Sequence, residues 1–221
     1  MSSFLTKSSA LGAEKILRLG FNFFVTVLIA RYFSLSDFGV VSLGKAILSI
    51  LITFASFGLI GLVSSEILKK IDDAAAITLT VFCIKTVFGL LTFLAAYIYF
   101  SLTSESSEVI WLISIILLQL PLQNSEAFEQ YFYAASNYKP LLISRILAVL
   151  GGSAFLIYGL NAGNLFFAVA SFTINSFVFL IIVMAFYFSE QSIVGIKLSS
   201  SMTIDLIKKG GILVAGGLFA R

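Results

Sequence analysis

Residues 146–189 read ILAVLGGSAFLIYGLNAGNLFFAVASFTINSFVFLIIVMAFYFS, and they contain no charged side chain. A soluble domain cannot bury so long an uncharged stretch, whereas a bilayer can. A helix rises about 1.5 Å per residue and the hydrocarbon core is about 30 Å thick, so one crossing takes roughly 20 residues. The stretch is too long for one transmembrane helix and long enough for two, with the turn marked by Gly159, Asn161, Gly163 and Asn164.

The composition of the whole chain agrees with a membrane protein. Hydrophobic residues make up 59% of the sequence and charged residues only 11%, whereas globular domains carry about 25% charge. The apolar runs 40–68 and 165–188 are largely continuous, unlike the alternating segments of a membrane β-barrel. We therefore expect an all-α polytopic membrane protein. The net charge of +3 does not imply a nucleic-acid partner, because the basic residues form no dense cluster.

Two residue types limit the chemistry that the chain can support. The sequence has no histidine, which excludes imidazole metal ligands, a Ser-His catalytic pair and a histidine proton relay. Cys83 is the single cysteine, so no internal disulfide can form. We expect neither a metal site nor a catalytic site.

Polar breaks divide the sequence into six predicted spans. They cover roughly 10–32, 42–65, 75–100, 109–133, 140–159 and 165–187. We expect residues 1–188 to form a six-helix lobe, 189–209 a cytoplasmic linker and 210–221 the truncated start of a seventh helix. A helix that stops in mid-membrane leaves unsatisfied carbonyl groups in lipid. We therefore expect the chain to be a fragment of a longer protein.

Lysine and arginine are unevenly distributed over the predicted loops. With a cytoplasmic N-terminus, the inner loops hold Lys7, Lys69, Lys70, Lys139, Lys197, Lys208 and Lys209. The outer loops then hold only Arg31, and the third loop has Glu105 and Glu108 without a base. Because basic loops favour the cytoplasmic side, the pattern predicts a multi-pass protein with its N-terminus in the cytoplasm.

Charged residues inside the predicted spans are the candidates for function, because each costs roughly 2.5–3.5 kcal/mol at the bilayer centre. Lys85 and Arg18 are expected to be deepest, about 16 Å and 14 Å from their span ends. Arg145 is expected to be shallower, and Lys45 to lie near the outer end of the second span. Snorkelling to the headgroups would explain the shallow charges, including Lys15 and Glu129. The other alternative is a structural ion pair, such as Arg18 with Glu14 four residues earlier.

Polar residues recur at helical spacing in four predicted spans, which places each set on one helix face. The sets are Glu14, Arg18, Asn22 and Thr26; Lys45, Ser49, Thr53 and Ser56; Gln119, Gln123, Glu126, Gln130 and Tyr133; and Asn164, Ser171 and Asn175. Interhelical hydrogen bonds, worth about 0.6 kcal/mol each, would explain the serines and threonines. Polar faces on four spans, together with deep cations, indicate instead a wet, net-positive lumen. The predicted cations are Arg18, Lys85, Arg145 and Lys45, and the further polar lining is Glu14, Asn22, Gln119, Gln123 and Glu126.

Two features would allow such a bundle to bend. Pro121 lies in the middle of the fourth predicted span, where it removes a backbone hydrogen bond and favours a kink. Gly151 and Gly152 interrupt the fifth span, although close helix packing is an equally good explanation. An anion with a large polar part is the ligand that a positive lumen of this kind would take.

Short motifs give a resemblance to a known family. The run LIARYFSLSDFG at 28–39, followed by a helix ending with FGL at 57–59, resembles the start of the bacterial polysaccharide flippases. These are the Wzx-type O-antigen exporters, in the wider superfamily that includes peptidoglycan-lipid flippases and multidrug extruders. The sequence FEQY at 128–131, continuing through YKP at 138–140 to Arg145, is also similar to that family.

The resemblance implies a transporter without cofactors in the bacterial inner membrane. Family members have twelve or more helices in two six-helix lobes, and they move an undecaprenyl-pyrophosphate-linked oligosaccharide to the outer leaflet by alternating access. Cations of the central cavity would hold the anionic headgroup, and here these are Arg18, Lys85 and Arg145, with Lys45. Proton or sodium coupling and contacts with other polysaccharide assembly proteins are further expectations, and Glu14 and Glu126 would separate the bases in an empty site.

Three alternative functions remain open from the sequence. A cation or drug antiporter of the same superfamily would need a deep unpaired carboxylate. A membrane-embedded polysaccharide polymerase or ligase would need a large outer loop for catalysis. A purely structural membrane subunit would not need Lys85 near the middle of the bilayer.

Overall fold

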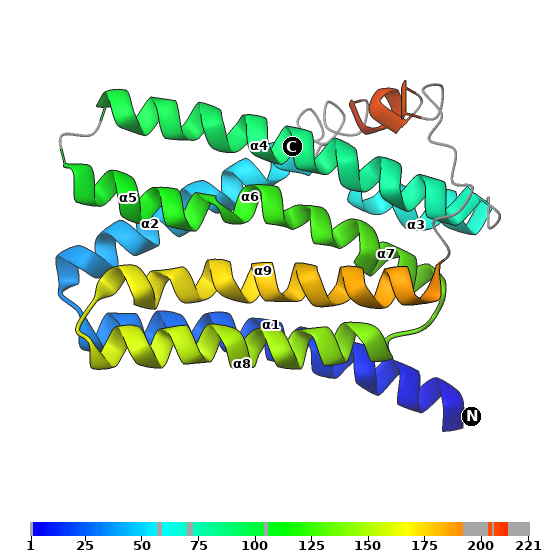
Figure 1. Ribbon diagram of the computed structural model, residues 1–221, viewed down its shortest axis with the longest axis horizontal. Coiled ribbons are helices and arrows are strands. Elements are labelled where there is room, and N and C mark those ends of the chain that lie inside the picture. Colours follow the sequence, from blue (N-terminus) through cyan, green and yellow to red (C-terminus); the bar gives the residue numbers. More distant parts are fainter. Residues whose placement is uncertain are drawn as a thin grey trace, which may run out of the picture.

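The structure, a computed structural model, describes residues 2–56, 59–69, 73–103, 106–191, 203–204 and 206–211, and no β-strand occurs among them. The helices lie side by side in an elongated bundle (Figure 1). Most of the predicted linker 189–209, and the predicted seventh helix beyond Gly211, fall outside these residues. The expectation of a truncated helix there remains untested.

The helices follow one another with short connections. They are α1 (Ser2–Tyr32), α2 (Leu35–Ala55), α3 (Ile60–Lys69), α4 (Ala74–Thr103), α5 (Ser107–Leu117), α6 (Gln119–Leu122), the 3-10 turn η2 (Gln123–Ser125), α7 (Glu126–Ala134), α8 (Lys139–Asn161) and α9 (Leu165–Glu190). Five segments are long and apolar enough to cross a bilayer: 35–55, 74–103, 107–134, 139–161 and 165–190. The prediction of an all-α polytopic membrane protein is confirmed. Helix α1 covers the first predicted span, and the complete six-span lobe stays a prediction.

The first connection is shorter than predicted. Ser34 caps α2, because its hydroxyl accepts a hydrogen bond from the Asp37 amide at 3.1 Å while the Asp37 carboxylate accepts one from the Ser34 amide at 3.3 Å. This capping box starts a helix, so most of the predicted break between the first two spans, 33–41, belongs to α2 instead. Lys45 therefore lies about 15 Å into the helix. Its predicted place near the outer end of the span is wrong.

The second predicted span, 42–65, is not one helix. Helix α2 ends at Ala55 and α3 begins at Ile60. The sequence between them contains Gly58, and glycine costs about 1 kcal/mol relative to alanine inside a helix. A hydrophobic run alone could not reveal this break.

The kink predicted at Pro121 is confirmed. The α-helix of the fourth span is interrupted after Leu117 and passes through α6 and the 3-10 turn η2 before α7 begins. Proline has no N–H to donate to the carbonyl four residues earlier, so the helix cannot continue unchanged. Helix α4 approaches this kink closely at Gly89, where an added Cβ would lie 2.8 Å from the Leu120 carbonyl oxygen and 2.8 Å from the Pro121 Cα.

We expect Gly89→Ala to lower the free energy of unfolding by about 1–3 kcal/mol, because the atoms it meets belong to the backbone and cannot turn aside. Thermal unfolding of the full-length protein in detergent measures the effect. Gly20→Ala is the matched control, since nothing lies within 4 Å of its Cβ position, and alanine should be neutral or slightly stabilising there. Equal melting temperatures for the two variants would contradict the close packing of α4 on the kink.

Glycines in α8 allow close packing against α9, and they do not interrupt the helix. Helix α8 runs unbroken past Gly152, whose Cβ position lies 2.6 Å from the Phe21 ring and 3.0 Å from the Ser171 carbonyl oxygen. The interruption expected there is therefore wrong. The turn predicted after it is present: Gly163 has a φ of 60°, and the Asn164 side chain caps α9 by accepting a hydrogen bond from the Phe166 amide at 3.0 Å.

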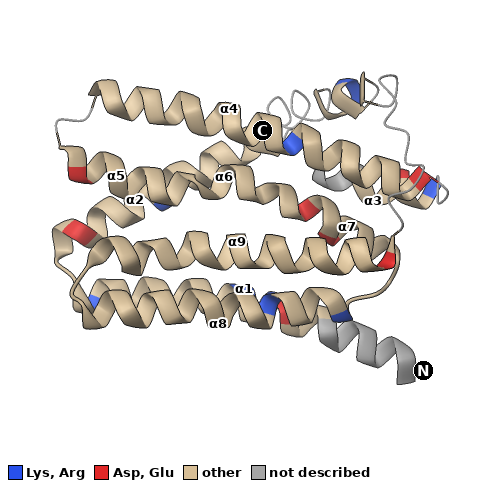
Figure 2. Ribbon diagram, in the orientation of Figure 1, with Lys and Arg blue, Asp and Glu red and all other residues tan. Residues whose placement is uncertain are grey.

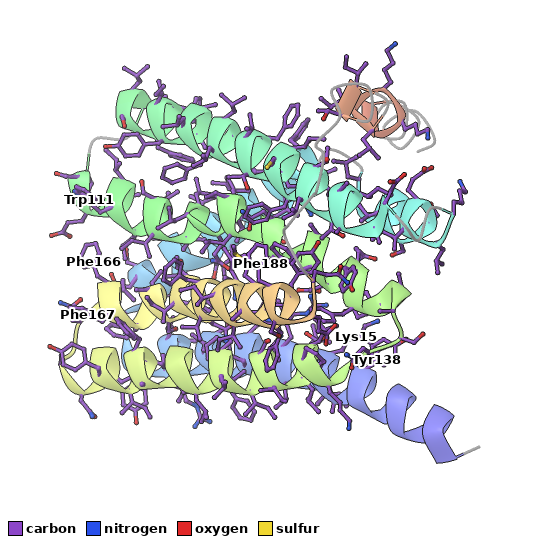
Figure 3. The ribbon with its side chains drawn as sticks, turned by 45° about the vertical axis from the view of Figure 1, so that its right-hand side comes forward. Lys15, Trp111, Tyr138, Phe166, Phe167 and Phe188 are labelled. Carbon is purple, nitrogen blue, oxygen red and sulfur yellow. The ribbon has the colours of Figure 1, made fainter. Side chains whose placement is uncertain are left out.

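Aromatic residues lie toward both ends of the bundle. Trp111 and Phe167 are near one end. Tyr138 lies toward the other end, where α8 begins, and the cation Lys15 lies toward that end too (Figure 3). Trp111 is 60% exposed, as expected for a ring at a membrane interface. Between the ends, the buried apolar residues form two clusters, one around Phe128 and Tyr187 and the other around Phe21 and Phe172.

Candidate functional site

A polar cavity of about 110 Å³ lies between α1, α6, η2, α7, α8 and α9. Phe179 of one apolar cluster and Phe172 of the other both line it, so it separates the two parts of the core. A water molecule needs roughly 10–15 Å³ of such space, and several waters therefore fit. Six of the residues that were predicted to line the lumen do line this cavity: Arg18, Asn22, Gln119, Gln123, Glu126 and Arg145.

Arg145 is the most constrained cation of the cavity. Its Nε donates to Glu14 Oε1 at 2.8 Å and its Nη2 lies 3.5 Å from Glu129 Oε1. Its guanidinium also lies over the Phe179 ring, 3.7 Å from the centroid. The residue is only 4% exposed. Arg145 therefore already has partners on both sides of its guanidinium.

Arg18 is held much more loosely. Its side chain is 40% exposed, and its Nη1 lies 3.9 Å from Glu129 Oε2, at the limit of an ion pair. The expected structural pair of Arg18 with Glu14 is wrong, because the Glu14 carboxylate binds Arg145 instead. Of the two arginines that line the cavity, Arg18 is the one with donors free for a ligand.

Lys85 is buried rather than open to the cavity. Its side chain is 2% exposed and forms an ion pair with Glu126. Glu126 lines the cavity and is 19% exposed, whereas Lys85 is not part of the lining. Lys85 therefore lies behind Glu126 and acts on the cavity through that carboxylate.

Lys45 lies beside the cavity behind Phe172. Its Nζ donates to the Thr26 hydroxyl at 2.9 Å and sits 4.0 Å from the centroid of the Phe172 ring. In the described part of the chain it forms no salt bridge with a carboxylate. A hydroxyl and an aromatic face therefore stabilise this cation.

The structure thus brings six of the nine predicted residues to one cavity and leaves Lys45, Lys85 and Glu14 behind its wall. Sequence reasoning missed Glu129, which it explained by snorkelling. It placed Asn175 on a polar helix face but did not count it among the lining residues, and the buried Nδ2 of Asn175 has no hydrogen-bond partner. The spacing of Glu126 and Glu129 puts both on one helix face, and that signal could have identified Glu129. Within the described residues, no acidic or cysteine cluster could hold a metal ion.

Figure 2 shows acidic and basic residues on α7 and on α1 and α8 within the bundle, in addition to those toward its ends. In an apolar bundle this arrangement defines a polytopic α-helical membrane protein with an internal charged cavity. A family model described as polysaccharide biosynthesis protein matches residues 4–221. The chain therefore belongs to this family, that of the Wzx-type polysaccharide flippases. Comparisons with curated proteins and with solved structures find no match.

Proposed function

We propose that this protein moves a lipid-linked oligosaccharide, carried on undecaprenyl pyrophosphate, from the cytoplasmic to the outer leaflet of a bacterial inner membrane. The family supports a general role in polysaccharide export. The observation that carries the finer proposal is Arg18, a cation that is 40% exposed in a polar cavity inside an apolar bundle. A charge in that position is costly in lipid, and an anionic headgroup is the ligand that would compensate for it.

The cavity residues divide the task of holding such a headgroup. Arg18 provides guanidinium donors, which suit the oxygens of a pyrophosphate. Side-chain amides that can bind the sugar part of the substrate come from Asn22, Gln119 and Gln123. The apolar tail of the substrate stays in the bilayer. Arg145 positions the acidic residues, and Lys45 adds positive potential from behind Phe172. A second lobe would complete the lumen in the alternating-access cycle.

The orientation remains part of the proposal. The end of α3, the connection between α7 and α8, and the described start of α1 lie at one end of the bundle (Figure 1). Lys69 and Lys139 belong to that end. The positive-inside rule assigns it to the cytoplasm, which gives the headgroup access from the side on which lipid-linked sugars are assembled.

The cation-antiporter alternative is less well supported. Each acidic residue in the cavity wall or directly behind it is paired with a base among the described residues: Glu14 and Glu129 with Arg145, and Glu126 with Lys85. An antiporter of this kind would need a deep carboxylate that is open to a cation. The polymerase alternative would need a large outer loop, whereas the connections between the described helices at that end are the short segments 33–34, 104–106 and 162–164.

We expect Arg18→Gln to reduce surface polysaccharide at least tenfold at matched expression of the full-length protein, because the pyrophosphate loses its open cation. Arg18→Lys should retain part of the export, since a lysine keeps the charge but not the fork of donors. Lys15→Gln is the matched control on the same helix, because Lys15 is exposed and does not line the cavity. Normal export by Arg18→Gln would overturn the proposed headgroup role.

A further inference from the structure

Glu129 is the carboxylate that the two cavity arginines share. Its Oε1 lies 3.5 Å from Arg145 Nη2, and its Oε2 lies 3.9 Å from Arg18 Nη1. The three side chains come from α7, α8 and α1, so one carboxylate connects three helices. Glu129 lines the cavity but is only 5% exposed, which makes it a fixed acceptor rather than a solvated surface charge.

The charges around this carboxylate are balanced when the cavity is empty. Arg18 and Arg145 face Glu14 and Glu129, so each local cation has a local anion. An incoming anion would find no excess positive charge from these four groups. It can bind Arg18 favourably only if it takes the place of the Glu129 carboxylate, because like charges near the same guanidinium repel.

The geometry shows which of the two arginines would change partner. Arg145 keeps the shorter contacts, at 2.8 Å to Glu14 and 3.5 Å to Glu129, and it is covered by the Phe179 ring. Arg18 has the longer contact, at 3.9 Å, and the exposed side chain. When Arg18 turns to a ligand, Glu129 retains Arg145 as its counter-ion and is not left as an unpaired buried charge.

We infer that Glu129 is a positioning residue that competes with the anionic headgroup for Arg18. This inference rests on the proposed function, and it adds how binding and release of the headgroup at Arg18 are controlled. In the empty protein the carboxylate holds Arg18 and so ties α1 to α7. A pyrophosphate displaces it from Arg18, which releases α1 from α7 at the moment of capture. The same competition favours release of the headgroup later in the cycle, since Glu129 remains beside Arg18.

The test is the affinity of the purified full-length protein for inorganic pyrophosphate, measured by isothermal titration calorimetry in detergent. Removal of the competing charge in Glu129→Gln is expected to lower Kd by on the order of tenfold, a usual size for coupling between sites. A residue that only supported the fold would weaken binding when replaced, so the expected sign separates the two roles. In an Arg18→Gln background the gain should disappear, because Arg18 is the group for which the two anions compete.

Glu66→Gln is the matched control. Glu66 is also a buried carboxylate, 8% exposed, but its partners are Lys69 and Lys209 and it lies outside the cavity. Burial opposes ionisation of its carboxyl group, yet the hydrogen bonds and charges of Lys209 and Lys69 leave its pKa below the ordinary value. It is therefore another paired anion, and its replacement should leave the pyrophosphate Kd unchanged.

The outcomes distinguish this inference from the proposed function. If the wild-type protein and every variant fail to bind pyrophosphate, the headgroup role of Arg18 is wrong. If the wild type binds through Arg18 but Glu129→Gln binds with equal or lower affinity, the competition is wrong and the proposed function stands. Glu129→Asp serves if the glutamine variant does not fold, because its shorter side chain withdraws the charge from Arg18 and should also tighten binding.

Discussion

Arg145→Ala is expected to lower the free energy of unfolding by about 3–5 kcal/mol, the usual cost of removing one partner from a buried ion pair. The loss is large because two carboxylates depend on this guanidinium. Glu14 is 2% exposed and Glu129 is 5% exposed, so neither can replace Arg145 with bulk water. Equilibrium unfolding of the full-length protein in mixed detergent and SDS micelles measures the difference.

Two further variants test the reason for that loss. Arg145→Lys keeps the charge but cannot reach Glu14 and Glu129 with a planar fork, so we expect an intermediate loss of stability. Lys15→Ala removes an exposed cation from α1, and surface changes of this kind stay within about 0.5 kcal/mol. A loss below 1 kcal/mol for Arg145→Ala would show that water reaches the carboxylates, which contradicts their burial.

The local parts of the fold were predictable because their causes lie within a few residues of one another. The turn at 162–164 follows from Gly163 and Asn164, since a left-handed backbone and a side-chain cap are properties of those residues. The kink follows from Pro121 for the same reason. The start of α2 was missed although Ser34 and Asp37 form a capping box, because these polar residues were assigned to the break before a second span that begins at 42.

The pairing of charges could not be predicted in the same way. Helical periodicity shows that Glu14 and Arg18 share a face of one helix, but it does not show which helix that face meets. The partner of Glu14 is Arg145, which is 131 positions away. Burial also depends on the assembled bundle: Lys85 and Arg18 have similar predicted depths, yet their side chains are 2% and 40% exposed. The predicted depth in the membrane therefore identified both residues as candidates. It could not show that Lys85 is buried in an ion pair whereas Arg18 is available to a ligand.

Glu126→Gln is expected to cost about 3–5 kcal/mol of unfolding free energy, because it leaves the buried Lys85 ammonium without a counter-ion. Lys85→Met should cost less. This substitution leaves the Glu126 carboxylate without its partner, but that carboxylate is 19% exposed and lines the cavity, where water can reach it. The Lys85 side chain, by contrast, is only 2% exposed. The two partners of one ion pair thus differ in the cost of their removal, and the same SDS titration shows the difference.

The double variant Lys85→Met/Glu126→Gln is expected to recover most of the stability, since replacing a whole buried pair by uncharged groups is often neutral. It also decides how Lys85 takes part in transport. Lys85 lies behind Glu126, so we expect the stable double variant to export polysaccharide better than Glu126→Gln does. An export defect that persists at wild-type stability would show instead that the lysine itself contacts the headgroup, through a movement that brings its side chain into the cavity.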